Sequence, residues 1–480
     1  MSLLAIDQGT TSTRAIVVEA DGSARLLASF THAQSYPHPG RVEHDAEELL
    51  AHVRACLDAA QGEGVEAVGI ANQGESCLAW DAATGAPLGP VIVWQDARTI
   101  EAVEALRAAG HEAAGHEAAV RATTGLPLDP YFSASKLGWL LRETPGAPAL
   151  AAAGRLRLGT TDAFFRDRLT GRFETDASTA SRTALMDLST GQWSPAMCAL
   201  FGVPMGALPA ITATTGDLGR IGALRLAASV VDQQAALYGH GCRAPGEAKI
   251  TFGTGAFALM VSGAARPHAD GPLPTVAWQL TGAPLTYALD GGVYAASSAV
   301  NWARGLGLFD DWAQIDTFAA PPAISRGLVF VPALAGLACP HWDRAARGAW
   351  LGMGLDTSRA DLMQALLEGV ALRMAEVMAA MPPAPAAPPV AIDGGMTANA
   401  YFCQFLADVL ARPVRVAAAP ECTGLGTAAL AAQGAGLPLT LPQGGRLIAP
   451  RPIDPAWHGR FAAARAAVQG FALTGPITTR

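Results

Sequence analysis

Three short turns of this chain combine glycine with hydroxyl or carboxyl side chains, and a fourth segment places a carboxylate directly after an apolar run, as a site that binds phosphate would require. Asp7 precedes a turn at residues 9–12, Asp232 directly follows an apolar run, a second hydroxyl turn occupies residues 253–255, and a Gly-Gly turn lies within residues 393–399. In such turns, backbone N–H groups and hydroxyls can face an anion without obstruction by side chains. Phosphoryl transfer needs these groups, a carboxylate that holds magnesium and a base for the accepting hydroxyl. The four segments therefore predict a site for phosphoryl transfer.

Two common nucleotide-binding motifs are missing from the sequence. It contains neither G-x-x-x-x-G-K-[ST] nor G-x-G-x-x-G with a ribose-binding acid downstream, which excludes a P-loop and argues against NAD. The chain has only two lysines, Lys136 and Lys249. The positive charge beside a phosphate is therefore expected from arginine, and Arg14 follows the first hydroxyl turn.

Each candidate side chain also has an ordinary structural explanation. Asp232 can simply cap a helix, and Glu75 can be a solvated loop acid. Tyr131, after Asp-Pro, can belong to a turn, while Trp94 and Phe257 can be core aromatics. The chemical interpretation depends on the whole set of segments and not on any one of these residues.

Composition bounds the class of protein. Of the 480 residues, 50% are hydrophobic and 15% are charged, and the formal net charge is −8. A chain of this length is expected to form two or three packed domains. The negative charge argues against nucleic acid or an acidic membrane surface as the main partner. The apolar runs fall short of the roughly 20 residues that a membrane-spanning helix needs.

The cysteines, the histidines and the N-terminus give three further expectations. Seven cysteines are scattered without a C-x-x-C pair, which predicts reduced, buried thiols. The histidines show no ligand spacing, so no metal is assigned to them. No basic region precedes the first apolar run, and Asp7 interrupts it. A secretory signal is therefore not expected, and the predicted location is the cytoplasm.

Alternating strand and helix patterns predict an α/β fold. In the first half, Asp45 is the expected cap of a helix over residues 45–60. Strands are predicted in that half at residues 3–6, 14–19, 24–31, 65–71, 91–94 and 227–231. In the second half, helical spacing covers residues 358–380. Further strands are predicted there at residues 248–252, 256–261, 390–393 and 413–416, with helices after Asn399 and over 424–433.

One local pattern occurs twice. Residues 3–19 and residues 248–261 both read as strand, small hydroxyl turn and strand. Two such hairpins half a chain apart suggest two related domains, since no short repeat is present. The glycine-rich stretch 241–246 is the expected crossing between them.

Several longer stretches carry a family resemblance. They include DQGTTSTR (7–14), VWQDART (93–99), DPYFSASKLGWLL (129–141), ASRTAL (180–185), DQQAALYG (232–239), GTGAF (253–257) and DGGMTAN (393–399). Together they resemble the FGGY carbohydrate kinases of the actin-like ATPase superfamily, and most closely the members that phosphorylate glycerol. The resemblance runs over nearly the whole chain and is far more specific than one glycine motif.

The resemblance implies roles for individual residues. The polyol pocket would be formed by Glu75, Trp94, Tyr131, Asp232, Gln233 and Phe257. Asp232 would be the general base, and Asp7 and Asp232 would hold Mg²⁺ through water. The nucleotide and its phosphates would lie against Thr10, Thr11, Ser12, Arg14, Gly253, Thr254, Asn301, Gly394, Gly395 and Asn399.

The same resemblance implies an architecture and an activity. The fold would consist of two actin-like (ribonuclease H-like) domains around an interdomain cleft, residues 1–242 on the polyol and phosphate side and residues 243–480 on the nucleotide side. The activity would be ATP-dependent phosphorylation of a small polyol, glycerol to glycerol 3-phosphate in the first place. By analogy, the chain would form a homodimer or a higher homo-oligomer.

One departure leaves the acceptor open. Where the glycerol-phosphorylating members have Asn-Gln-Arg-Glu-Thr, residues 72–76 read Asn-Gln-Gly-Glu-Ser. Gly74 removes a guanidinium that donates to the polyol hydroxyls. Erythritol, another tetritol or pentitol, or a ketopentose is therefore an alternative acceptor. The more distant alternative is an actin-like ATPase without an acceptor, which would have no use for a polyol pocket beside the γ-phosphate.

Overall fold

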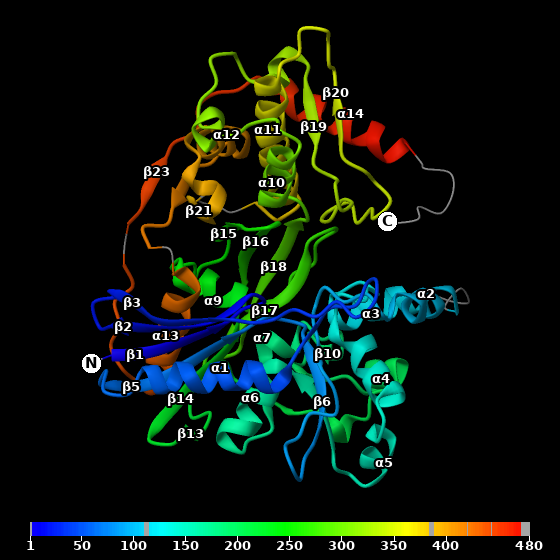
Figure 1. Cartoon of the computed structure of the whole chain (residues 1–480), viewed down its shortest axis with the longest axis vertical. Helices are drawn as coiled ribbons and strands as arrows, with labels where there is room; N and C mark the ends of the chain where they lie inside the picture. Colours follow the sequence, from blue (N-terminus) through cyan, green and yellow to red (C-terminus); the bar gives the residue numbers. More distant parts are fainter. Residues whose placement is uncertain (1, 110–114, 384–387, 420, 443, 472–480) are drawn as a thin grey trace.

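The computed structural model describes residues 2–109, 115–383, 388–419, 421–442 and 444–471. Two mixed β-sheets lie one above the other along the longest axis of the molecule (Figure 1). Elements from the first half of the chain form the lower part of this view, and most elements from the second half form the upper part. The division at residues 242 and 243 stays a prediction.

The first sheet has six strands in the order β13-β14-β5-β1-β2-β3. Antiparallel pairing joins β1 to β2 and β2 to β3, while β1, β5 and β14 are parallel. The strands span Ser2–Gln8 (β1), Ser12–Glu19 (β2), Ala24–Thr31 (β3), Val65–Asn72 (β5), Arg220–Ile221 (β13) and Leu224–Val231 (β14). Because β1, β5 and β14 are parallel, residues that follow them meet at one edge of the sheet.

The second sheet repeats this order. It runs β17-β18-β16-β15-β21-β22-β23, with β15 antiparallel to β16 and parallel to β21. Its strands span Ala248–Phe252 (β15), Ala256–Gly263 (β16), Leu273–Gln279 (β17), Leu285–Val293 (β18), Val390–Gly394 (β21), Val414–Val416 (β22) and Arg446–Ile448 (β23). The core series β3-β2-β1-β5-β14 and β18-β16-β15-β21-β22 are therefore equivalent, as the repeated hairpin predicts.

Helices cover both sheets. In the first half they are α1 (Ala46–Ala59), α2 (Ile100–Ala109), α3 (Gly115–Thr124), α4 (Ser133–Glu143), α5 (Ala147–Ala152), α6 (Thr161–Thr170), α7 (Ala177–Ala180), α8 (Pro195–Phe201) and α9 (Asp232–Gly239). In the second half they are α10 (Ser297–Gly305), α11 (Arg359–Ala379), α12 (Ala400–Leu410), α13 (Cys422–Ala435) and α14 (Ala456–Gly470). One apolar core lies against each sheet, and a third contains residues of both sheets together with α13.

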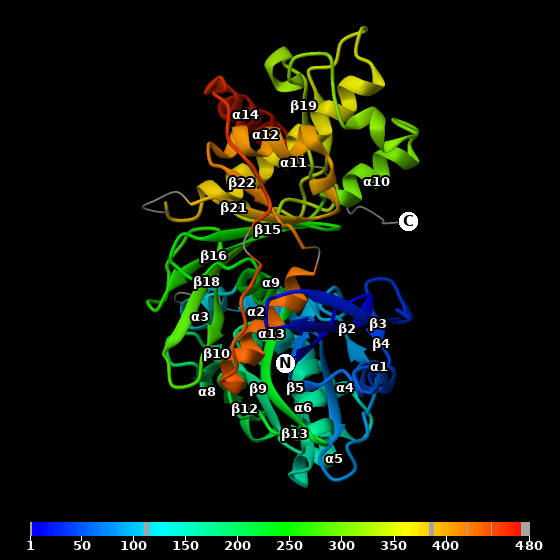
Figure 2. The same ribbon diagram turned by 90° about the vertical axis from the view of Figure 1, so that its left-hand side faces the viewer.

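Helix α13 is exceptional, because it belongs to the second half of the sequence but packs on the first sheet. It contacts β1, β5, β14 and α9, and both views place it beside β1 (Figures 1 and 2). Two positions allow this approach. A Cβ at Gly426 would lie 1.8 Å from the Ala235 carbonyl oxygen, and one at Gly69 would lie 2.8 Å from that of Thr427. Only glycine permits such close contact of two backbones.

A smaller sheet carries part of the site. Its order is β4-β7-β6-β8, formed by Glu43–His44 (β4), Cys77–Asp81 (β6), Val91–Ile92 (β7) and Leu156–Thr160 (β8). Shorter pairs are made by β9 (Glu174–Asp176) with β12 (Ala210–Thr212), β10 (Met186–Asp187) with β11 (Gln192–Trp193), and β19 (Val329–Val331) with β20 (Ala349–Leu351).

Most of the elements predicted from the sequence are confirmed, with small shifts at their ends. Asp45 caps α1 by accepting from two backbone N–H groups, and α11 runs from Arg359 to Ala379. The strand expected at 91–94 is shorter and ends at Ile92, because the Trp94 N–H donates to the Ser76 hydroxyl at 3.1 Å instead of to a strand. All seven cysteines are free and buried. Within the described part of the chain, no helix is both long enough and apolar enough to cross a membrane.

Candidate active site

The first hydroxyl turn connects β1 to β2 at the edge where the parallel strands end. Asp7 and Arg14 face each other across this hairpin, and their side chains form an ion pair of 2.5 Å. Arg14 also binds Glu421, which precedes α13, at 2.7 Å. The Thr10 hydroxyl accepts from the indole N–H of Trp94 at 3.0 Å. The turn is therefore fixed both by the residue that precedes α13 and by an aromatic residue that follows β7 of the neighbouring small sheet.

Glu75 follows β5 in an unusual backbone conformation, with φ of 60°. Left-handed backbone is costly for a side chain larger than glycine, and such residues concentrate at functional sites. The carboxylate of Glu75 is buried and accepts from Arg182 Nε at 2.6 Å. Arg182 also binds Asp290, on β18 of the second sheet, at 3.0 Å. This ion-pair network joins the two halves of the chain.

Two aromatic residues stand beside Glu75. The rings of Trp94 and Tyr131 lie 5.4 Å apart in a tilted arrangement. The fully buried Lys136 holds both backbones in place, since its ammonium donates to the carbonyl oxygens of Val93, Trp94 and Tyr131 at 3.0, 3.0 and 3.1 Å. Burial lowers the pKa of Lys136 to about 8, because it disfavours the charged ammonium. The three hydrogen bonds favour the charged form and partly offset this effect.

Asp232 is the first residue of α9 and directly follows β14. Its carboxylate accepts from the Gln233 N–H at 2.6 Å. The side-chain oxygen of Gln233 in turn accepts from Lys249 on β15, whose ammonium also donates to the Thr251 hydroxyl at 2.8 Å. The buried lysine of the second sheet thereby orients the amide next to Asp232.

These side chains enclose a cavity of about 130 Å³. Its lining residues include Thr10, Gln73, Gly74, Glu75, Trp94, Tyr131, Arg182, Asp232, Gln233, Phe257 and Asp290. All six residues expected to bind a polyol are therefore brought together, with Phe257 contributed by β16 of the second sheet. A cavity of this size holds only a few water-sized groups, so its ligand must be small.

The cavity is strongly acidic, and its charges influence one another. Burial, followed by the charge of Asp7, raises the pKa of Asp232 to about 7. Burial also raises the pKa of Asp7 and of Glu75 above their usual range, although Arg14 and Arg182 oppose the rise. A carboxylate with a pKa near neutrality is suited to exchange a proton with a bound hydroxyl.

A second cavity, of about 560 Å³, lies in the second half of the chain. Asn301 on α10, Gly395 and Asn399 line it, together with apolar side chains that include Val300, Trp312, Ile315, Leu367 and Met396. The Asn399 side chain caps α12 and donates to the Ile315 carbonyl at 2.7 Å. An apolar cavity with a few polar groups is typical of a site for a small molecule or a cofactor.

The other residues expected at the nucleotide lie in turns. Gly253 and Thr254 are exposed between β15 and β16. Gly394 has φ of 93°, and a Cβ there would lie 2.2 Å from the Phe252 carbonyl oxygen. Thr11 is exposed and Ser12 begins β2. These turns do not line the second cavity, and their roles stay predictions.

Sequence reasoning missed several residues that line or support the first cavity. Arg182, Asp290 and Gln73 line the cavity. Lys136 holds the backbone carbonyls of Trp94 and Tyr131, and Lys249 holds the side-chain amide of Gln233. Arg182 and Lys136 lie within stretches that carry the family resemblance, but no local pattern gives either one a role. The rarity of lysine was the available signal, since both lysines of the chain are fully buried beside this cavity.

Comparisons with known proteins define the class. The molecule has two actin-like, ribonuclease H-like domains, and its fold matches that of solved kinases over nearly the whole chain. Residues 2–233 match the N-terminal domain of the FGGY family of carbohydrate kinases, and residues 248–435 match the C-terminal domain. The chain belongs to this family and is a carbohydrate kinase, as the resemblance in its motifs predicts.

Individual relatives are similar over most of their length. A glycerol kinase of Citrifermentans bemidjiense is 42% identical over 452 residues, which cover 91% of this chain and 90% of the relative. A glycerol kinase of Bordetella parapertussis is 40% identical over 485 residues, 96% and 94% of the two chains. The crystal structure of Plasmodium falciparum glycerol kinase with ADP has a TM-score of 0.87 at 28% identity and covers 99% of each chain. A xylulose kinase from Rhodospirillum rubrum has a TM-score of 0.85 at 27% identity, with 98% of this chain and 99% of that one covered.

Proposed function

We propose that this carbohydrate kinase transfers the γ-phosphate of ATP to glycerol and forms glycerol 3-phosphate. The observation that carries the proposal is the small cavity in which Asp232, with its raised pKa, lies among aromatic side chains and hydrogen-bonding groups. The curated relatives named glycerol kinase support the same acceptor.

The cavity offers a polyol both donors and acceptors. Arg182 Nη1 and Gln73 Nε2 are buried donors that find no partner among the described residues, and both residues line the cavity. Glu75, Asp232 and Asp290 supply carboxylate oxygens. Since an unpaired buried donor is costly, a ligand with several hydroxyls suits this arrangement, while Trp94, Tyr131 and Phe257 pack against its carbon atoms.

In the proposed mechanism, Asp232 accepts the proton of the attacking hydroxyl as that oxygen approaches the γ-phosphorus. The Gln233 N–H, 2.6 Å from the carboxylate, holds Asp232 in position. Glu75, fixed by Arg182, orients the other hydroxyls of the acceptor. The aromatic residues exclude water, which would otherwise compete with the acceptor for the phosphate.

The residues present fit ATP and Mg²⁺. The cavity lined by Asn301, Gly395 and Asn399 offers apolar walls and amides to a purine nucleoside. The charge of Asp7 raises the pKa of Asp232, so the two carboxylates lie close to each other. Such a pair is a donor set that a divalent cation would neutralise. Mg²⁺, when bound, would screen the phosphate charge during transfer.

One observation favours a longer acceptor as the second candidate. Gly74 lines the acceptor cavity without a side chain, and an adjoining cavity of about 40 Å³ shares Tyr131, Arg182, Phe257 and Asp290 with it. A tetritol, a pentitol or a ketopentose would extend from one cavity into the other.

The test is ADP release by the purified protein with Mg-ATP and a panel of acceptors. The panel contains glycerol, dihydroxyacetone, erythritol, other tetritols, pentitols and ketopentoses, with a control lacking acceptor. The highest kcat/KM is expected with glycerol, and phosphorus NMR should identify glycerol 3-phosphate. If a longer acceptor gives a higher kcat/KM than glycerol, the second candidate replaces the first. ADP release at the same rate with and without an acceptor would overturn both.

A further inference from the structure

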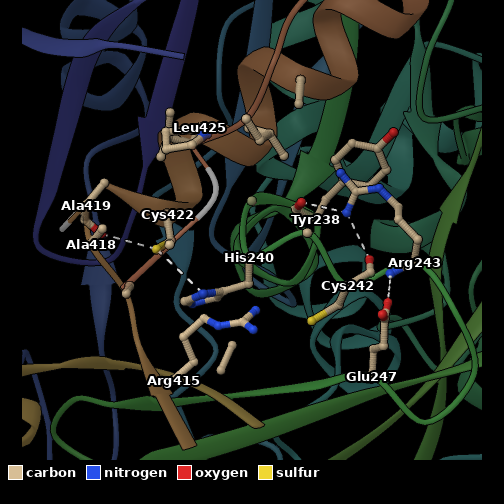
Figure 3. Close-up of a pocket in the computed structure, with 18 of the residues that line it drawn as sticks. Tyr238, His240, Cys242, Arg243, Glu247, Arg415, Ala418, Ala419, Cys422 and Leu425 are labelled. Carbon is tan, nitrogen blue, oxygen red and sulfur yellow. Dashed lines mark hydrogen bonds between the residues drawn. The ribbon is translucent and has the colours of Figure 1, made fainter. Parts of the chain in front are cut away.

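A pocket of about 550 Å³ lies outside the proposed active site, between helices α9 and α13 and strands β21 and β22. Figure 3 shows its lining, to which the end of α9, β22 and the start of α13 all contribute. His240 and Cys422 point toward each other within it. None of the residues assigned to ATP, Mg²⁺ or the acceptor lines this pocket.

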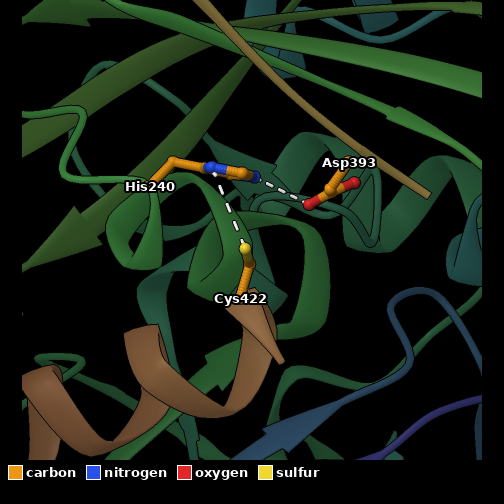
Figure 4. Close-up of side chains that lie close together, drawn as sticks. All are labelled: His240, Asp393 and Cys422. Carbon is orange, nitrogen blue, oxygen red and sulfur yellow. Dashed lines mark hydrogen bonds and ion pairs between the residues drawn. The ribbon is translucent and has the colours of Figure 1, made fainter. Parts of the chain in front are cut away.

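His240 connects two elements through its two ring nitrogens. Its Nε2 lies 2.7 Å from a carboxylate oxygen of Asp393 on β21. Its Nδ1 lies 3.9 Å from Cys422 Sγ at the start of α13 (Figure 4). The three side chains offer one ligand atom each, all within 4.8 Å of one another.

These distances suit a transition-metal ion between sulfur and nitrogen. A Zn–S bond of about 2.3 Å and a Zn–N bond of about 2.0 Å at a tetrahedral angle place the two donor atoms roughly 3.5 Å apart. The observed distance of 3.9 Å between Nδ1 and Sγ would need to shorten only slightly. Asp393, as acceptor from the Nε2–H of His240, would leave the Nδ1 lone pair facing the sulfur, which is the carboxylate–histidine–metal arrangement.

We propose that Cys422 and His240, oriented by Asp393, form a binding site for a thiophilic divalent metal ion such as Zn²⁺ at the junction of the two domains. The site is separate from the Mg²⁺ chemistry of the proposed active site. The inference does not depend on which acceptor the enzyme phosphorylates.

A second observation supports a cation at this site. Asp393 Oδ1 is buried and makes no well-aligned hydrogen bond among the residues that the structure describes, although the Thr251 hydroxyl and the Lys249 ammonium lie close enough to lower the pKa of this carboxylate. An unpaired buried carboxylate oxygen is costly, and positive charge at the neighbouring imidazole would compensate for it. The open pocket beside His240 and Cys422 leaves room for water to complete the coordination.

The chemistry of Cys422 favours a ligand over a nucleophile. The Cys422 thiol donates its proton to the Ala419 carbonyl oxygen at 3.4 Å. A thiophilic metal displaces that proton on binding, whereas a nucleophilic role needs the thiolate beforehand.

A metal here would tie together three elements that the sequence separates widely. His240 follows α9 on the first sheet, Asp393 lies on β21 of the second sheet, and Cys422 begins α13, which returns to the first sheet. Occupation of the site would therefore restrain the two sheets relative to each other. The histidine spacing in the sequence gave no sign of it, because the ligands are brought together only by the fold.

The test is titration of the full-length, chelator-treated protein with Co²⁺ under anaerobic conditions. A near-ultraviolet thiolate-to-cobalt charge-transfer band should saturate at one equivalent. Zn²⁺ should displace it, while excess Mg²⁺ should not, since oxygen ligands suit Mg²⁺ and sulfur does not. Zn²⁺ should also raise the thermal midpoint of unfolding.

Two variants and a matched control make the assignment specific. Cys422→Val and His240→Gln should abolish the band or weaken binding by more than about tenfold. Cys242→Ala removes another buried cysteine of the same pocket and should leave the band intact. If Cys422→Val does not fold, Cys422→Ser takes its place. A wild-type protein without the band, or a band that survives in both ligand variants, would overturn the proposal.

Discussion

At the scale of single residues, Asp232 has the most direct chemical test. Asp232→Asn keeps the size and the hydrogen bond from the Gln233 N–H but removes the proton acceptor. We expect kcat with Mg-ATP and glycerol to fall by roughly 10²–10⁴-fold, the usual contribution of a general base. ATP affinity, measured by calorimetry, should change little, because the nucleotide cavity lies elsewhere. Near-normal turnover in this variant would exclude Asp232 as the base.

Gly74 tests the identity of the acceptor. A Cβ at residue 74 would lie 3.2 Å from Val231 Cγ1, so a side chain fits after a shift of a few tenths of an ångström. Gly74→Arg should lower the KM for glycerol, because a guanidinium would add charged donors to an acidic cavity. Steady-state kinetics with glycerol measure the change.

The control for this prediction is Gly74→Ala, which adds the same Cβ without the charge. It should leave the KM for glycerol near the wild-type value. An unchanged or higher KM in Gly74→Arg, with Gly74→Ala normal, would indicate that the cavity is shaped for a different acceptor.

At the scale of elements, Glu376 connects α11 to α14. Burial alone would raise the pKa of Glu376, but hydrogen bonds from His341 and the Arg373 and Arg465 guanidinium groups outweigh it and lower the pKa to about 2. The carboxylate pairs with Arg465 at 2.9 Å and also contacts Arg373. A depressed pKa stabilises the fold above the unfolded pKa of about 4.5, and this stabilisation is lost as pH falls toward 2.

Glu376→Gln should therefore reduce the free energy of unfolding by roughly 3 kcal/mol at pH 7, and by much less near pH 2.5. Thermal unfolding of both proteins across this pH range measures the difference. Glu101→Gln, at an exposed position of α2, is the control and should be nearly neutral. A difference between Glu376→Gln and wild type that does not shrink in acid would contradict the prediction.

The packing of α13 on α9 depends on Gly426. Gly426→Ala would place a Cβ 1.8 Å from the Ala235 carbonyl oxygen, and neither backbone can yield easily. We expect a loss of about 3 kcal/mol or more in unfolding free energy. Gly459→Ala in α14 is the matched control, since a Cβ there meets nothing within 4 Å. It should be neutral or stabilising by up to about 1 kcal/mol, and equal losses in the two variants would refute the packing argument.

How far the sequence predicted these elements depends on whether the signal was local. The strands, the turns after β1 and β15, and the cap of α1 follow from residues close in sequence. The short β7 and the partners of the site residues do not. Arg182 is 107 positions from Glu75 and 108 positions from Asp290 along the chain, so no local spacing predicts this ion-pair network. His240, Asp393 and Cys422 meet for the same reason.

Local sequence patterns likewise did not predict that α13 packs against the first sheet. The sequence predicts a helix over residues 424–433, and a helix is found at Cys422–Ala435. Its partner depends on glycines in three separate segments, at residues 69, 239 and 426, where backbones approach closely. Periodicity predicts that a helix forms but does not indicate which sheet it packs against.

At the scale of the whole molecule, the proposed function would divide the reactants between two cavities, one for the nucleotide and one for the acceptor. The residues that line the nucleotide cavity all come from the second half of the chain. Most of those that line the acceptor cavity, including Asp232, come from the first half. Phe257 and Asp290 reach the acceptor cavity from the second sheet. Phosphoryl transfer requires the attacking and leaving oxygens in line at one phosphorus atom, so the halves must approach each other when both ligands are bound.

We therefore expect both ligands together to make the protein more compact. Asp232→Asn allows the test with ATP itself, because turnover is slow enough for the ternary complex to persist. Small-angle X-ray scattering should give a smaller radius of gyration with Mg-ATP and glycerol together than with either alone. The physical reason is that closure excludes water from the acidic acceptor cavity, and it needs contacts to both substrates. The four states to compare are the protein without ligands, with Mg-ATP, with glycerol and with both. Identical scattering in all four would mean that the domains already hold the reactive arrangement without ligands, and that the aromatic side chains alone exclude water.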